Sequence, residues 1–179
     1  MAIQSSDILF KLSVKTGSAG NSTAGTTGGS LGGYISTTQI TDATLHNLFD
    51  AITGDENAAS DVEYRCFFVH NSHATLTLLA PVVWLSSETS GGAAVAVAVD
   101  ATAASAVGAA SAQALQVADE GTAPSGPSFS SPTSKGTGLA LSDIPAGQCK
   151  AIWVRRTAAN TSPVDTDGVV IRVEGDTMA

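Results

Sequence analysis

The sequence predicts a mainly β protein, an antiparallel β-sandwich with one short helix and an extended N-terminal arm. Three observations support this: several short runs alternate apolar and polar residues, clusters of Gly, Pro, Ser and Thr separate them, and one segment has helical spacing. A chain of 179 residues is long enough to bury a substantial core. We expect an N-terminal strand with a Gly/Ser/Thr-rich arm over residues 1–33 and the sandwich domain over residues 34–179.

The N-terminal part combines one regular and one irregular segment. Residues 7–15 alternate apolar and polar side chains, which predicts a half-buried strand. Residues 16–33 are so rich in Gly, Ser and Thr that they hide little apolar area to offset the entropy of ordering. They are either a flexible linker or an arm that becomes ordered against a neighbouring subunit.

The helix is expected near residues 42–53. Thr41 or Asp42 can cap its first turn, and Gly54 can end it. Four apolar residues at helical spacing would share its buried face: Leu45, Leu48, Phe49 and Ile52.

The middle of the chain predicts several strands. Residues 62–70 and 75–79 form two β-rich arms around a polar break, and Pro81 is expected at the start or edge of the next strand. Residues 93–100 alternate Val with Ala, which fits a strand with one closely packed face. Residues 101–117 are expected to be a loop with a short strand near 114–117.

The C-terminal third begins with a long loop. Residues 121–138 are rich in Gly, Pro and Ser and are expected to form an interaction surface. Strands are predicted over residues 148–156 and 168–174, with residues 157–167 joining them as a hairpin.

Composition limits the partners. The chain carries 8 basic and 16 acidic residues, and a net charge of −8 repels phosphate backbones and anionic lipid. Without a long apolar run or a signal-peptide pattern, we expect a soluble protein made in the cytosol that binds neither nucleic acid nor membrane. Cys66 and Cys149 lie in predicted strands, and they form either a buried free pair or an inter-sheet disulfide.

Several residues are candidates for reaction or metal centres. His70 and His73 have a spacing that can hold one metal ion, but they flank a turn and lack a zinc motif, so we interpret them, like His46, as solvated. Residues 165–168, Asp-Thr-Asp-Gly, resemble the start of a calcium loop whose remaining ligands are missing. No nucleophile elbow or phosphate-binding loop is present. We therefore assign no catalytic, cofactor-binding or metal residue and predict that the chain is not an enzyme.

Aromatic and basic residues are interpreted as structural. Alternation should turn Arg155 and Arg156 to opposite faces, with one paired to a carboxylate and one exposed. Trp84 and Trp153 are expected to anchor the core or an interface. Tyr34 is the aromatic residue on which a sugar-binding site would depend.

Two sequence features resemble the immunoglobulin-like sandwich. They are the strand ending Phe67-Phe68-Val69-His70-Asn71 and the turn Ile144-Pro145-Ala146-Gly147-Gln148 that leads to the Trp153 strand. The two cysteines are too far apart for the usual cysteine–tryptophan–cysteine pattern, and a jelly roll remains an alternative.

With its Gly/Ser/Thr arm, small-residue surface and acidic balance, the chain resembles virion structural proteins of tailed bacteriophages, in particular head decoration or cement proteins. The resemblance implies a homotrimer at local threefold positions on the capsid exterior, assembled in the host cytoplasm, that binds and braces the major capsid protein. A tail or baseplate component is the alternative within the same class. A carbohydrate-binding or adhesin module is the alternative from another class.

Overall fold

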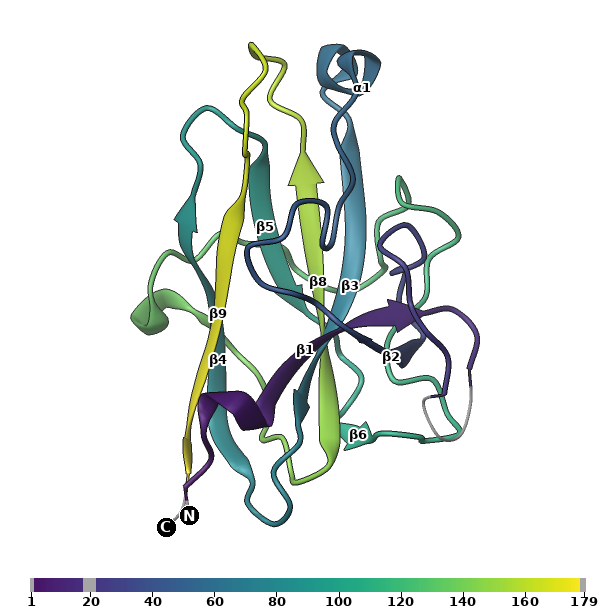
Figure 1. The fold of residues 1–179 in the computed structure, drawn as a ribbon, viewed down its shortest axis with the longest axis vertical. Helices are drawn as coiled ribbons and strands as arrows, with labels where there is room; N and C mark the ends of the chain where they lie inside the picture. Colours follow the sequence, from purple (N-terminus) through teal and green to yellow (C-terminus); the bar gives the residue numbers. More distant parts are fainter. Residues whose placement is uncertain (1, 18–21, 178–179) are drawn as a thin grey trace.

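The chain folds as two antiparallel sheets that face each other, which confirms the predicted β-sandwich (Figure 1). The structure, a computed structural model, describes residues 2–17 and 22–177. The strands are β1 (Ile8–Val14), β2 (Tyr34–Gln39), β3 (Val62–Asn71), β4 (Leu78–Glu88), β5 (Ala94–Val99), β6 (Ser105–Ala106), β7 (Leu139–Ala140), β8 (Gln148–Thr157) and β9 (Val169–Thr177). The helical elements are α1 (Gly54–Ala59) and two 3-10 turns, η1 (Ser5–Asp7) and η2 (Lys135–Thr137).

The larger sheet has six strands in the order β2-β1-β3-β8-β5, with β6 also paired to β8. Its central strands β3 and β8 pair in one unbroken register from Val62↔Thr157 to His70↔Cys149. Both contain runs of consecutive buried residues. A strand of this kind is covered on both of its faces.

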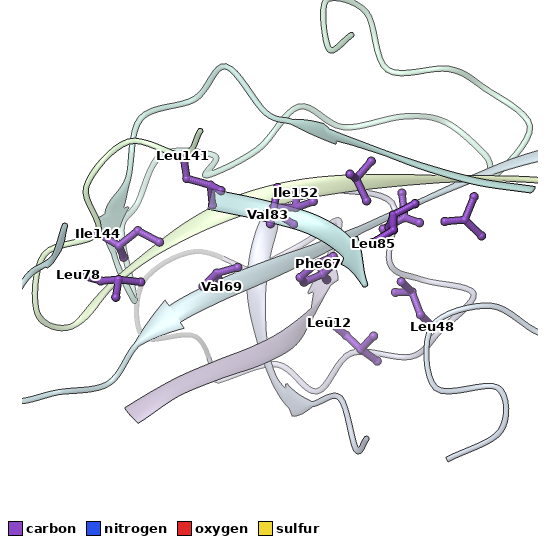
Figure 2. Close-up of a cluster of buried hydrophobic side chains, with 13 residues drawn as sticks. Leu12, Leu48, Phe67, Val69, Leu78, Val83, Leu85, Leu141, Ile144 and Ile152 are labelled. Atoms are coloured by element: carbon purple, nitrogen blue, oxygen red, sulfur yellow. The ribbon is translucent and has the colours of Figure 1, made fainter. Parts of the chain in front are cut away.

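The first core lies between the two sheets (Figure 2). The smaller sheet, in the order β7-β4-β9, contributes Val83 and Leu85 from β4. The larger sheet contributes Phe67 from β3 and Ile152 and Val154 from β8, all at most 1% exposed.

A second core lies on the opposite face of the larger sheet. There the buried side chains of Phe68 and Trp153 pack with Leu31, Ala114 and Val117, which come from segments without regular structure. Residues 107–117, which follow β6, and the described part of residues 16–33 therefore form a third layer. The short strand expected near residues 114–117 is wrong, because only the isolated bridge Gly32↔Gln116 forms there.

The expected N-terminal arm is not confirmed. β1 lies inside the larger sheet, between β2 and β3. Residues 22–33 fold back on their own chain: the Cys66 N–H donates to the Ser30 carbonyl at 2.7 Å, and the Gly32 N–H donates to Ser13 Oγ at 2.9 Å. Residues 18–21 of the expected arm lie outside the described residues.

The helix expected near residues 42–53 is also wrong. Ala43 and His46 have φ angles of 54° and 58°, in the left-handed region, so the segment turns instead of coiling. The apolar residues with helical spacing lie on a loop and do not share one buried face. Leu48 is buried in the first core, while Leu45 is 64% exposed. The short helix α1 follows directly, and Gly54, expected to end a helix, is its first residue.

Two further strand predictions need correction. Residues 157–167 do not form a hairpin, because β8 belongs to the larger sheet and β9 pairs with β4 in the smaller one. Pro81 lies inside the central strand β4, where an irregularity between Leu79 and Val82 accommodates it. Among the described residues, no helix has the length and apolar character to cross a membrane.

Candidate functional site

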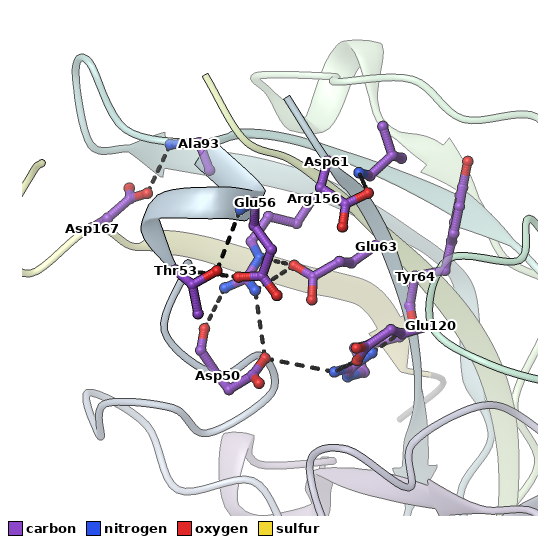
Figure 3. A network of polar contacts seen from close by, with 12 residues as sticks. Asp50, Thr53, Glu56, Asp61, Glu63, Tyr64, Ala93, Glu120, Arg156 and Asp167 are labelled. Carbon is purple, nitrogen blue, oxygen red and sulfur yellow. Dashed lines mark hydrogen bonds and ion pairs between the residues drawn. The ribbon is translucent and has the colours of Figure 1, made fainter. Parts of the chain in front are cut away.

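The densest group of charged side chains closes one end of the first core (Figure 3). Glu63 and Arg65 come from β3 and point to the same face, because residues two apart on a strand do so. Arg156 stands opposite Glu63 on β8. Loops bring in Asp50 and Glu120.

The pair of Glu63 with Arg156 forms the buried part of this group. Arg156 donates from Nε to Glu63 Oε2 at 2.7 Å and also binds that oxygen through Nη2. The Glu63 side chain is only 7% exposed. Burial raises the pKa of the Glu63 carboxyl, and Arg156 opposes that rise by stabilising the charged form.

The second guanidinium fastens two loops to the sandwich. Arg65, whose side chain is 1% exposed, binds Glu120 through Nη2 and lies 3.7 Å from Asp50 Oδ1. Arg156 Nη2 lies 3.5 Å from the same Asp50 oxygen. The Phe49 ring packs under both guanidinium groups, with its centroid 5.4 Å from Arg65 Cζ and 4.7 Å from Arg156 Cζ.

The three carboxylates have the spacing of a metal site, with oxygens of Asp50, Glu63 and Glu120 within 4.8 Å of one another. Each of them already faces a guanidinium of Arg65 or Arg156. The two guanidinium groups therefore offset the charge of the three carboxylates. A metal ion that bound here would have to displace these guanidinium groups or lie close to their positive charges. We interpret the group as an ion-pair clamp that closes the sandwich end.

Asp100 is a second buried polar centre, 1% exposed at the end of β5. Its Oδ2 accepts hydrogen bonds from Trp153 Nε1 at 2.8 Å and from the Leu115 N–H at 2.9 Å. Its Oδ1 accepts from the Thr102 N–H at 2.8 Å. This carboxylate thus holds the loop over residues 101–117 against the sheet.

Gln113 and Lys150 complete that attachment. Gln113 Oε1 accepts from the Ile35 N–H at 3.1 Å, and its Nε2 donates to the Ala106 carbonyl at 3.0 Å. Lys150 Nζ donates to the Asp100 carbonyl at 2.7 Å. Burial lowers the pKa of Lys150.

The structure gives each candidate histidine a different position. His70 is half-buried on β3, and its Nδ1 is buried without a hydrogen-bond partner among the described residues. His73 Nδ1 accepts hydrogen bonds from the N–H groups of Thr75 and Leu76, at 3.1 and 3.0 Å, and so holds its own turn. Neither belongs to a group with metal-binding spacing in the described part of the chain, and His46 is exposed on a loop.

The acidic segment at 165–168 is also used internally. Asp167 accepts a hydrogen bond from the Ala93 N–H at 2.7 Å and thereby joins the loop before β9 to the start of β5. The prediction for the arginine pair is confirmed for Arg156, which pairs with a carboxylate. Arg155 is half-buried instead of exposed, with its guanidinium 5.5 Å from the Phe129 ring centroid.

The cysteine alternatives are decided by strand register. Both cysteines are free and buried. Cys66 is opposite Trp153, four residues along β8 from Cys149, a separation of about 13 Å along the strand that exceeds the reach of a disulfide. Burial raises the pKa of Cys149 to about 12, so its thiol stays protonated. Trp84 and Trp153 are both buried, as expected of structural anchors.

A shallow surface depression lies beside β2, between residues 25–27 and 38–47. Threonine hydroxyls and the exposed Leu45 line it. Tyr34, the residue expected to carry a sugar site, does not line it and is half-buried.

Part of this chemistry can be predicted from the sequence. Strand alternation indicated a carboxylate partner for Arg156, but it could not say which one, because strand pairing brings Glu63 across from a distant part of the chain. Asp100 was missed, although a lone Asp that ends an apolar strand is a usable signal. Comparison of the chain with protein-family models, with curated proteins and with solved structures finds no match.

Proposed function

We propose that this chain is a structural virion protein that binds the outside of a tailed-phage capsid and braces the major capsid protein. One observation supports it most: the irregular segments are fastened to the sandwich by buried polar contacts, as Asp100 does for residues 101–117. A surface that is rigid before binding loses little conformational entropy on contact with a lattice. The net charge of −8 suits a position outside the shell, away from packaged DNA.

Removal of the N-terminal residues 1–33 would not test this proposal. Deleting residues 1–33 would take β1 from between β2 and β3 and Leu31 from the second core. We expect the remaining chain not to fold, so loss of binding by that variant would say nothing about function.

The informative experiment uses the whole chain and heads assembled without it. We expect added protein to bind such heads at a saturating, fixed ratio to the major capsid protein, to appear on their outer surface by electron microscopy, and to raise the temperature at which they release DNA. Heads that bind none of the protein would overturn the proposal. Density confined to the tail or baseplate would support the alternative within the same class.

The resemblance to decoration proteins favours a trimer at local threefold positions, which native mass measures directly. A carbohydrate-binding module predicts a glycan-array signal that the substitution Tyr34→Ala removes. Tyr34 is half-buried and does not line the surface depression beside β2.

A further inference from the structure

The two outer edges of the larger sheet are covered by the chain itself. At the outer edge of β2, the Thr37 N–H donates to the Thr23 carbonyl at 2.9 Å. At the outer edge of β5, Val97 and Ser130 exchange two backbone hydrogen bonds of 2.8 and 3.0 Å. Irregular segments thus replace the missing neighbour of each outer strand in the larger sheet.

The outer edge of β9 is different. Throughout the described residues, the hydrogen bonds to the β9 backbone come from β4 alone, through the strand ladder and Ser86 Oγ. β9 has nine residues, contains no proline, and runs in full length beside β4 in Figure 1. A row of backbone N–H and C=O groups therefore lacks a protein partner, which is the feature that lets a strand pair with another chain.

The side chains of β9 alternate in a way that suits continuation of the sheet. Val169, Ile171 and Val173 pack against the first core, while Arg172 and Glu174 are exposed on the outer face. A strand added beside β9 would meet these side chains as cross-strand neighbours, and opposite charges at directly opposed positions attract.

We propose that the outer edge of β9 pairs antiparallel with β9 of a second copy of this chain, about a twofold axis at Val173, so that Arg172 of each copy meets Glu174 of the other. The two smaller sheets then join into one continuous sheet in the order β7-β4-β9-β9-β4-β7. Such a contact is isologous and closes on itself, which limits it to two copies.

The charges select this register. A twofold axis that keeps each side chain on its own face of the joined sheet must pass through a residue paired with itself. An axis at Arg172 places the two copies of Arg172 opposite each other, and an axis at Glu174 does the same with the two copies of Glu174. Both arrangements bring like charges together. An axis at Ile171 brings no opposite charges together. An axis at Gly175 places Glu174 of one copy opposite Asp176 of the other, which are like charges. Only the axis at Val173 forms two Arg–Glu pairs without a like-charge pair.

The existing contact of Glu174 is compatible with this pairing. Lys135 of η2 binds Glu174 Oε1 at 2.6 Å, and the second carboxylate oxygen remains available to Arg172 of the other copy. The other outer-face pairs, Val170 of each copy with Asp176 of the other, add no attraction. The inference does not rest on the proposed function, and it predicts a dimer where the resemblance predicts a trimer.

The test is a charge exchange followed by native mass. We expect the whole protein to have twice the 17.9 kDa chain mass at micromolar concentrations. Arg172→Glu alone and Glu174→Arg alone each place like charges together at two positions, and each should weaken self-association by at least about tenfold. Mixed in equal amounts, the two variants should form a heterodimer, because each then supplies the charge that the other needs.

Asp42→Lys is the control, since it reverses an exposed charge on a loop outside β9, and it should remain dimeric. Circular dichroism and thermal unfolding of each variant establish that it is folded. A wild-type monomer or trimer would overturn the inference, as would two single variants that stay dimeric. A mixture that fails to associate would overturn the register at Val173, and binding of β9 by an extended peptide of another protein in place of a second copy would overturn the choice of occupant.

Discussion

Gly32 occupies a position that a larger residue cannot fill without moving its neighbours. Its φ angle is +84°, and a Cβ atom there would lie 1.8 Å from the Leu115 carbonyl oxygen and 2.9 Å from Trp153 Cζ2. Gly32→Ala therefore combines backbone strain with a clash against backbone in the second core, and should lower the free energy of unfolding by about 3 to 5 kcal/mol. Urea denaturation measures this loss.

Gly28→Ala is the matched control, because it lies in the same segment and no atom beyond its two chain neighbours lies within 4 Å of the place that its new methyl group would take. We expect its effect to stay within about 0.5 kcal/mol. Equal stability losses for the two substitutions would contradict the packing of residues 22–33 against the larger sheet.

His70 gives the protein a pH dependence. Burial, and to a smaller degree the positive charge of Lys11, lower the pKa of His70 from its usual 6.5. The unfolded chain then binds a proton at a higher pH than the folded chain does. Stability should fall as the pH drops from 6.5 toward the lowered pKa, with a slope of at most about 1.4 kcal/mol per pH unit.

The measurement is urea denaturation over a pH series for wild type and for His70→Gln. The variant should show a flatter dependence below pH 6.5, because no imidazole remains to be protonated on unfolding. His46→Asn is the control, because it removes a histidine from an exposed loop. It shows how the loss of a histidine outside the sheet changes the pH dependence of stability. An unchanged slope in His70→Gln would mean that another group causes the dependence.

At the scale of elements, the position of the helix depends on its cap. Thr53 Oγ1 accepts a hydrogen bond from the Glu56 N–H at 3.3 Å, and the Glu56 carboxylate accepts one from the Thr53 N–H at 2.6 Å. This is the capping box that starts α1. Thr53→Ala should lower the free energy of unfolding by about 1 kcal/mol.

Thr41 offers the comparison, because it is the residue that helical spacing would make a cap. Thr41→Ala should change stability by less than about 0.5 kcal/mol, since Thr41 is exposed and precedes a turn. A larger loss for Thr41→Ala than for Thr53→Ala in thermal or urea unfolding would contradict the position of α1.

The elements differ in how much of them the sequence can predict. Alternation of side-chain types identifies β1 and β5, because that periodicity is local information in the sequence. The pairing of β9 with β4 is not local, so the sequence suggested a hairpin with β8 instead. The helix was misplaced because apolar spacing near Leu48 outweighed the capping signal of Thr53 and Glu56.

The candidate site shows the same limit. Because a buried charge without a partner is costly, the sequence alone predicts that Arg156 has a carboxylate partner. Only the strand register shows that this partner is Glu63. The second core was not predicted, because its covering segments are small-residue loops with little apolar area per residue. They stay in place through polar contacts such as those of Asp100, which composition does not reveal.

At the scale of the whole molecule, the two cores share the strands β3 and β8. Phe67 faces the first core and its neighbour Phe68 faces the second, so neither core can open without exposing the other side of the same strand. We therefore expect one cooperative unfolding transition, although the third layer has little regular structure. The alternative is that the third layer detaches first and leaves a stable sandwich.

The two tryptophans distinguish these cases, because Trp84 lies in the smaller sheet and Trp153 in the second core. Trp84→Phe leaves Trp153 as the fluorescent reporter, and Trp153→Phe leaves Trp84. In each variant, the fluorescence midpoint in urea should coincide with the midpoint of its own far-ultraviolet circular dichroism. Each variant is compared with itself, so the stability lost with the Trp153–Asp100 hydrogen bond does not affect the result. If Trp153 fluorescence changed at lower urea than the β-sheet signal, the third layer would be an independently opening unit, and the rigid outer surface that supports the proposed capsid contact would not exist.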